Sequence, residues 1–277
     1  MSRPEFRNPV VTGGMMAAVS VAVYMLGILV PGLASLLGAL PMAVCAMMIP
    51  LPAAMVSAVA AGLVIGFFLG PMTGMTFVCE FGLMGIYTGW AAAEGKRWFS
   101  IFIGGTLFAA AGMLLMLVAR FAVMGFDVQA FLGTFTDMRN EMMETVRASG
   151  LLEQMANQQQ SAEMLENTLS QVMQTLLELT PSLYLVVLAA ITLIHLWLLK
   201  WLSGRLRMPV VYALPRIDSF SAPAWMLVPF FLAWVGILVN NNLPFYPLWL
   251  AVINVMVICA ATFAAGGLSW VFRAVRW

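Results

Sequence analysis

The sequence is short of charge. Charged side chains make up 9% of its 277 residues and hydrophobic side chains 62%, whereas about a quarter of a soluble domain is charged. The stretch from Asn8 to Cys79 contains no charged residue and is followed by Glu80. A soluble core could not extend this far without a solvated face. The stretch must therefore contain several membrane crossings joined by short turns.

Other signals are missing as well. Three cysteines, Cys45, Cys79 and Cys259, lie in apolar runs without paired spacing, so neither a disulfide framework nor a zinc site is indicated. We find no nucleotide-binding loop, catalytic triad or HExxH motif, so we expect no enzyme, no cofactor and no metal. A net charge of +1 gives no indication of a nucleic-acid partner.

Long apolar runs without alternation predict an all-α, polytopic helical bundle and exclude a transmembrane barrel. We expect one membrane domain over 1–277. The N-terminus resembles a signal peptide, but no polar mature sequence follows, so we interpret it as a retained first span. The second and third of eight candidate spans adjoin proline-rich corners and could instead be half-helices. The eight runs are 11–30, 33–49, 53–69, 72–93, 98–119, 181–202, 225–239 and 246–272.

Positive charges favour one orientation. Eight crossings place ten of the thirteen Lys and Arg residues on the side of the N-terminus, leaving Arg120, Arg139 and Arg147 on the other. This bias predicts a protein of the bacterial cytoplasmic membrane with both termini in the cytoplasm.

The polar segment 127–180 would then face outward as an insert. Apolar residues recur in it at helical spacing on both sides of Ser149-Gly150, which predicts two amphipathic helices. They could form a cap on the bundle or at the lipid interface. The alternative is a lid, or a surface that docks an envelope protein, because methionine-rich faces suit variable partners.

Glu80 is the strongest single signal. An ionised carboxylate at mid-bilayer costs about 3 kcal/mol on insertion scales, so Glu80 should face the protein interior. Thr73, Thr76 and Tyr87 share its face at helical spacing and would form a polar stripe. Glu80 could bind a solute, or it could be a hydrogen-bonded carboxyl that only holds the bundle together.

The predicted depth of Glu80 in the membrane indicates which side chain could be its hydrogen-bonding partner. Glu80 and Asn254 each lie eight residues after the predicted outer end of their spans, about 12 Å below the surface at 1.5 Å per residue. The sequence therefore predicts that both face a common outward cavity, with Asn241 and Tyr246 at its mouth.

Two further features have competing interpretations. Gly14, Ala18 and Ala22 form a row of small residues on the first span, which could pack inside the bundle or dock another subunit. His195 lies near Lys200 and Trp201, so we favour an interfacial histidine over a proton relay.

Several motifs together resemble a known family. They are Thr12-Gly-Gly-Met-Met-Ala-Ala18, Ile49-Pro-Leu-Pro52, Gly70-Pro71, Gly95-Lys-Arg97 and Phe220-Ser-Ala-Pro-Ala-Trp225. They are similar to the YybS-like family of predicted bacterial membrane proteins, which is in turn distantly similar to the S components of energy-coupling factor transporters. The resemblance implies a compact bundle that binds a small nutrient near its outer face. It also implies docking of the energy-coupling subunit on the small-residue row of the first span.

The leading hypothesis is thus a solute-binding transporter subunit without its own energy source, which would work with an energy-coupling membrane subunit and its ATPases. A second hypothesis is a non-transporting scaffold whose external helices recruit an envelope or membrane partner. A third is a proton-coupled carrier that uses Glu80.

Overall fold

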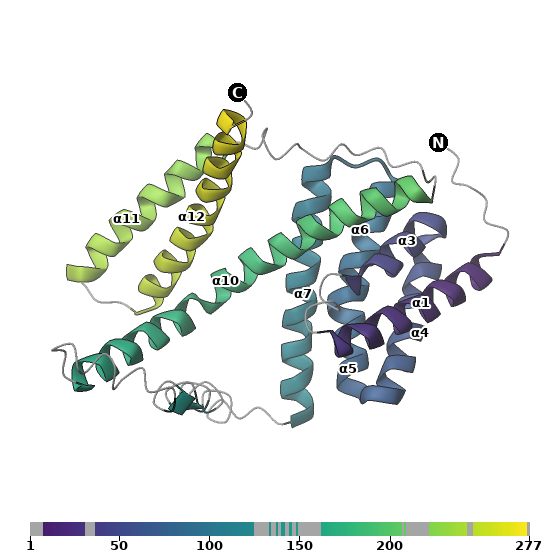
Figure 1. The fold of residues 1–277 in the computed structure, drawn as a ribbon, viewed down its shortest axis with the longest axis horizontal. Coiled ribbons are helices and arrows are strands. Elements are labelled where there is room, and N and C mark those ends of the chain that lie inside the picture. Colours follow the sequence, from purple (N-terminus) through teal and green to yellow (C-terminus); the bar gives the residue numbers. More distant parts are fainter. Residues whose placement is uncertain are drawn as a thin grey trace. The chain divides into compact units, whose positions relative to one another are not determined.

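The computed structural model describes residues 8–30, 37–124, 162–206, 208, 222–242 and 246–275, with a few single residues between 133 and 148. All the regular elements in these ranges are helices (Figure 1), which confirms the all-α class. The chain divides into two compact units. The first contains Met1–Met124 and Leu185–Arg216, and the second contains Gly125–Tyr184 and Ile217–Trp277.

The first unit begins with α1 (Pro9–Leu29), which Asn8 caps by accepting a hydrogen bond from the Val10 amide. There follow α3 (Leu40–Met48) and α4 (Leu51–Leu69). Gly70 ends α4 with a φ of +97°, which favours glycine, and Pro71 begins the next helix. The chain then runs through α5 (Pro71–Thr76), a π-helical turn η1 (Phe77–Gly82) and α6 (Leu83–Ala93).

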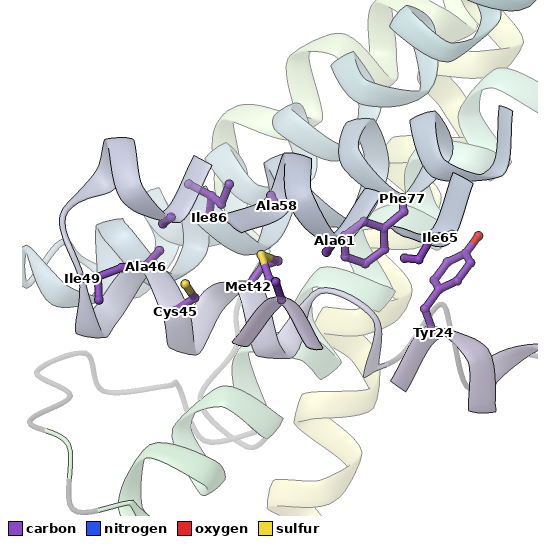
Figure 2. Packing of buried hydrophobic residues seen from close by; sticks show 12 residues of the cluster. Tyr24, Met42, Cys45, Ala46, Ile49, Ala58, Ala61, Ile65, Phe77 and Ile86 are labelled. Atoms are coloured by element: carbon purple, nitrogen blue, oxygen red, sulfur yellow. The ribbon is translucent and has the colours of Figure 1, made fainter. Parts of the chain in front are cut away.

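Glycines allow the helices of this unit to approach closely. A Cβ atom at Gly85 would meet the carbonyl oxygen of Ala39, and one at Gly89 would meet that of Ala43. The backbones of α3 and α6 therefore touch without intervening side chains, as is usual where small residues line a membrane helix interface. Beside this interface lies an apolar core that includes Met42, Ala58 and Phe77, from α3, α4 and η1 (Figure 2).

The described residues contain five helices long and apolar enough to cross a membrane, so the predicted count of eight is not confirmed. The five lie in 9–27, 51–69, 98–123, 170–205 and 248–271. Within the predicted run 33–49 the structure describes residues 37–49, in which α3 has nine residues. These nine residues span about 14 Å at 1.5 Å per residue, less than the ~30 Å core. Residues Leu40 to Met47 of α3 are all buried. Two further apolar segments are 71–93, interrupted by η1, and the shorter 224–239.

The second half of the predicted insert belongs to a longer element. α10 (Ala162–Arg205) continues through Pro181, so the amphipathic stretch before Thr180 is an extension of a span. Its 44 residues measure about 66 Å at 1.5 Å per residue, more than twice the hydrocarbon core. The predicted break at Ser149-Gly150 lies outside what the structure describes, and the outward position of 127–180 stays a prediction.

The remaining helices complete the two units. α7 (Trp98–Met124) and the C-terminal half of α10 belong to the first unit. The second unit contains the N-terminal half of α10, the 3-10 turn η3 (Ala224–Met226), α11 (Leu227–Asn242) and α12 (Tyr246–Val275). Within this unit α11 packs beside α12, where a Cβ atom at Gly236 would meet the side chain of Val252.

Candidate functional site

Glu80 lies in the π-helical turn η1. Such turns hold one residue more than an α-turn and occur frequently at functional sites. The turn packs tightly on α7, because a Cβ atom at Gly112 would meet the carbonyl oxygen of Cys79. The absence of a side chain at Gly112 thus lets α7 lie directly against the backbone beside Glu80.

The surroundings of Glu80 are aromatic. Its side chain is half-buried, and no other charged residue occurs between Arg7 and Glu94. Tyr24 of α1 packs edge-on against Phe77 and Phe81, with ring centroids 5.5 Å and 5.7 Å away. Figure 2 shows Tyr24 beside Phe77 at one end of the cluster. Tyr24 therefore packs on two aromatic residues of the turn that carries the carboxylate.

The predicted polar stripe is divided by this turn. The Thr76 hydroxyl donates to the Met72 carbonyl one turn earlier in its own helix. Tyr87, which follows the turn, donates to the Ser100 carbonyl over 3.2 Å and stacks on Phe108, so its ring faces α7. Because the π turn adds a residue, the 3.6-residue period cannot be extended from Glu80 to Tyr87. The roles of Thr76 and Tyr87 in solute binding stay predictions.

A second polar pair lies in the interior of the first unit. His195 is fully buried, and its Nε2 atom is 3.1 Å from the hydroxyl oxygen of Thr88. The same hydroxyl lies 2.9 Å and 3.0 Å from the Met84 and Gly85 carbonyl oxygens. It has a single proton, so the direction of its bond to Nε2 depends on the tautomer of His195, whose Nδ1 atom is buried without a hydrogen-bond partner among the described residues.

The interfacial interpretation of His195 was therefore wrong. Trp197 and Trp201 are 61% and 54% exposed, whereas His195 points the opposite way, into the packing of three helices. Thr192, three residues earlier, is also fully buried. Its hydroxyl donates to the Leu188 carbonyl at 2.8 Å and lies 3.7 Å from the sulfur of Met84. The three-residue spacing of Thr192 and His195 was a signal that the sequence reasoning missed.

In the second unit, both the oxygen and the amide group of the Asn254 side chain form hydrogen bonds. Its Oδ1 atom accepts from the Ser182 amide at 2.9 Å. Its Nδ2 group donates to the carbonyl oxygens of Glu178 and Leu250 at 2.9 Å and 2.8 Å. Trp249 donates to the Glu178 carboxylate at 2.9 Å. Asn254 thus binds the backbone of α10.

The predicted cavity that Glu80 shares with Asn254 stays a prediction, since the two residues belong to different units. The residues predicted to form the mouth of this cavity are not in a loop. Asn241 lies in the last turn of α11 and Tyr246 begins α12, so both positions are helical. Their side chains lie outside the described part of the chain.

The small-residue row of α1 faces outward. Gly14, Ala18 and Ala22 are all exposed, and a Cβ atom at Gly14 would meet nothing within 4 Å. Gly13 and Ala17, on the neighbouring face, are buried, with a Cβ atom at Gly13 meeting the Ser57 side chain. The chain's own helices therefore pack on the Gly13 face and leave the Gly14 face open.

Apolar helices of spanning length, close glycine contacts and exposed aliphatic faces define a polytopic helical membrane protein. The family model described as "Predicted membrane protein (DUF2232)" matches residues 18–276, and the chain belongs to this family. No curated protein and no solved structure matches it. The family description carries no activity, so the resemblance to S components stays a prediction.

Proposed function

We propose that this protein is a solute-binding subunit of a transporter in the bacterial cytoplasmic membrane, without its own energy source. The observation that carries the proposal is the position of Glu80. It is a half-buried carboxylate in a π-helical turn, beside the Tyr24 ring and far in sequence from any other charge. A carboxylate within apolar helices is costly to retain, and a function is the usual reason for its retention.

The proposed ligand class follows from this chemistry. A carboxylate binds cationic or hydrogen-bond-donating groups, and aromatic rings stack on flat or cationic ones. The site at η1 therefore suits a small solute that carries an amine or several N–H or O–H donors on an apolar or aromatic body.

An open face on α1 supports the same proposal. The Gly14, Ala18 and Ala22 face is open in the isolated subunit, and small residues allow a partner helix to approach closely. We propose that an energy-coupling membrane subunit, with its ATPases, docks on this face.

The docking proposal can be tested by purification in mild detergent. Ala18→Leu should abolish co-purification of an ATPase pair while leaving the protein folded, because the added side chain fills the open face. Ala60→Leu, an equally exposed alanine on α4, is the matched control and should retain the pair. Retention of the pair by the Ala18 variant would contradict docking on α1. Co-purification of an envelope protein without ATPases would instead favour the scaffold hypothesis.

A proton-coupled carrier is the second candidate. One observation favours it, since Glu80 and Thr88 lie on one continuous helical run and the Thr88 hydroxyl contacts His195 of α10. Solute uptake into reconstituted vesicles distinguishes a proton-coupled carrier from a binding subunit. A carrier accumulates solute when a proton gradient is imposed, whereas a binding subunit alone does not.

A further inference from the structure

The turn of α10 that contains Pro181 has an unusual hydrogen-bond pattern. Proline has no amide proton, so the Leu177 carbonyl loses its regular donor. In a regular α-helix the next amide, that of Ser182, would donate directly to the Glu178 carbonyl. Here the Asn254 side chain binds both groups, accepting from the Ser182 amide and donating to the Glu178 oxygen. Insertion of a side chain into this ladder is one of the known causes of helix kinks.

Other side chains supply donors to the same turn. The Thr180 hydroxyl donates to the Leu176 carbonyl at 3.0 Å, and the Ser182 hydroxyl donates to the Leu179 carbonyl at 2.9 Å. Hydroxyl groups bonded to the preceding turn often bend helices. Three side chains thus form hydrogen bonds with the backbone around Pro181, and Asn254 is the one among them that comes from another helix.

The two halves of α10 are also held by different neighbours. Before the proline, Glu178 is bound by Trp249 and Asn254 of α12. After it, Thr192 and His195 are bound by Met84 and Thr88 of α6. The turn at Pro181 lies between these two sets of contacts.

We propose that Pro181 is a bending point of α10 and that Asn254 acts as its splint, which closes the broken turn and limits the bend. Loss of the splint would leave the Ser182 amide and the Glu178 carbonyl without these partners, in a segment where Ser182 is 1% exposed. Restoration of a regular helix at position 181 would make the splint dispensable. The proposal is independent of whether Glu80 binds a solute.

Hydrogen exchange of the full-length protein in detergent tests the splint. Loss of a hydrogen bond worth about 1.4 kcal/mol raises exchange through local opening about tenfold, and we expect this increase at residues 179–185 in Asn254→Leu. In the Pro181→Ala background the same substitution should have little effect, because Ser182 can then donate to Glu178 within a regular helix. Trp249→Phe, which removes only the bond to the Glu178 carboxylate, is the control and should leave the Ser182 amide protected. If Asn254→Leu does not fold, Asn254→Asp supplies the comparison, since it keeps an acceptor for Ser182 and lacks the donor for Glu178.

Spin labels test the bend directly. Positions Gln171 and Val187 are exposed on either side of Pro181, about 24 Å apart along the helix at 1.5 Å per residue. With the three buried cysteines replaced by alanine, the distance distribution should broaden in Asn254→Leu and narrow again when Pro181→Ala is added. Unchanged exchange and unchanged width in Asn254→Leu, or an equal effect in both backgrounds, would overturn the proposal.

Discussion

Single residues in this protein gain their roles from hydrogen bonds that sequence alone does not reveal. Glu80 was recognisable because it is the one charge between Arg7 and Glu94. His195 and Asn254 were harder to interpret, since their partners Thr88 and Ser182 lie 107 and 72 residues away in the chain. Spacing within a helix gives the face of a side chain, but it does not identify the neighbouring helix.

The first prediction at this scale concerns Thr88. Thr88→Val leaves the Nε2 atom of His195 buried without its hydrogen-bond partner, which should lower the free energy of unfolding by about 1–3 kcal/mol. Unfolding in a denaturing detergent titration measures this effect. Thr106→Val is the control, because the Thr106 hydroxyl bonds only the Phe102 carbonyl of its own helix. Equal stability of the two variants would show that the Thr88–His195 bond contributes nothing.

At the scale of elements, the long apolar helices were predictable and their interruptions were not. The boundaries of α1, α4, α7 and α12 lie within a few residues of the predicted spans, because continuous hydrophobicity marks them. The π turn at Phe77–Gly82 carries no comparable signal in the residues that form it. The turn packs against Gly112 of α7, a contact that only the folded chain provides.

A pair of glycine substitutions tests the close packing of α3 and α6. Gly89→Ala would force a Cβ atom against the Ala43 carbonyl, so we expect a loss of about 1–3 kcal/mol of stability, typical of overpacking. Gly14→Ala is the matched control on an open helix face, and the better helix propensity of alanine should leave it neutral or up to about 1 kcal/mol more stable. Thermal unfolding in detergent compares them. A neutral Gly89 variant would contradict the close approach.

At the scale of the whole molecule, the sequence predicted an all-helical membrane protein but not the number of crossings. Three predicted runs are not among the five candidate spans: 33–49, in which the described helix α3 has nine residues, 72–93, which η1 interrupts, and 225–239, which is shorter. If the run 33–49 does not cross and the run 72–93 does, the number of crossings before Lys96 is odd. Arg3 and Arg7 would in that case lie on the side opposite Lys96 and Arg97, and the positive-inside rule would place the larger group of charges in the cytoplasm.

Cysteine labelling of intact cells decides this topology. We expect a cysteine at position 96 to be protected from an impermeant reagent and one at position 2 to be labelled, because α3 does not cross. Protection of both positions would show that residues 31–49 do cross the membrane and would restore the eight-span arrangement with both termini in the cytoplasm. Labelling of position 96 would contradict both arrangements.

The central claim, that Glu80 binds a solute, is tested most directly by mass spectrometry of the small molecules released from purified protein. Wild-type protein and Glu80→Gln are purified in mild detergent and denatured. Glu94→Gln is the matched control, since Glu94 is an exposed carboxylate just after the same helical run. The account predicts a compound with amine or hydroxyl donors that accompanies wild type and Glu94→Gln and is lost from Glu80→Gln. The same compounds in all three samples, or none in any, would contradict it.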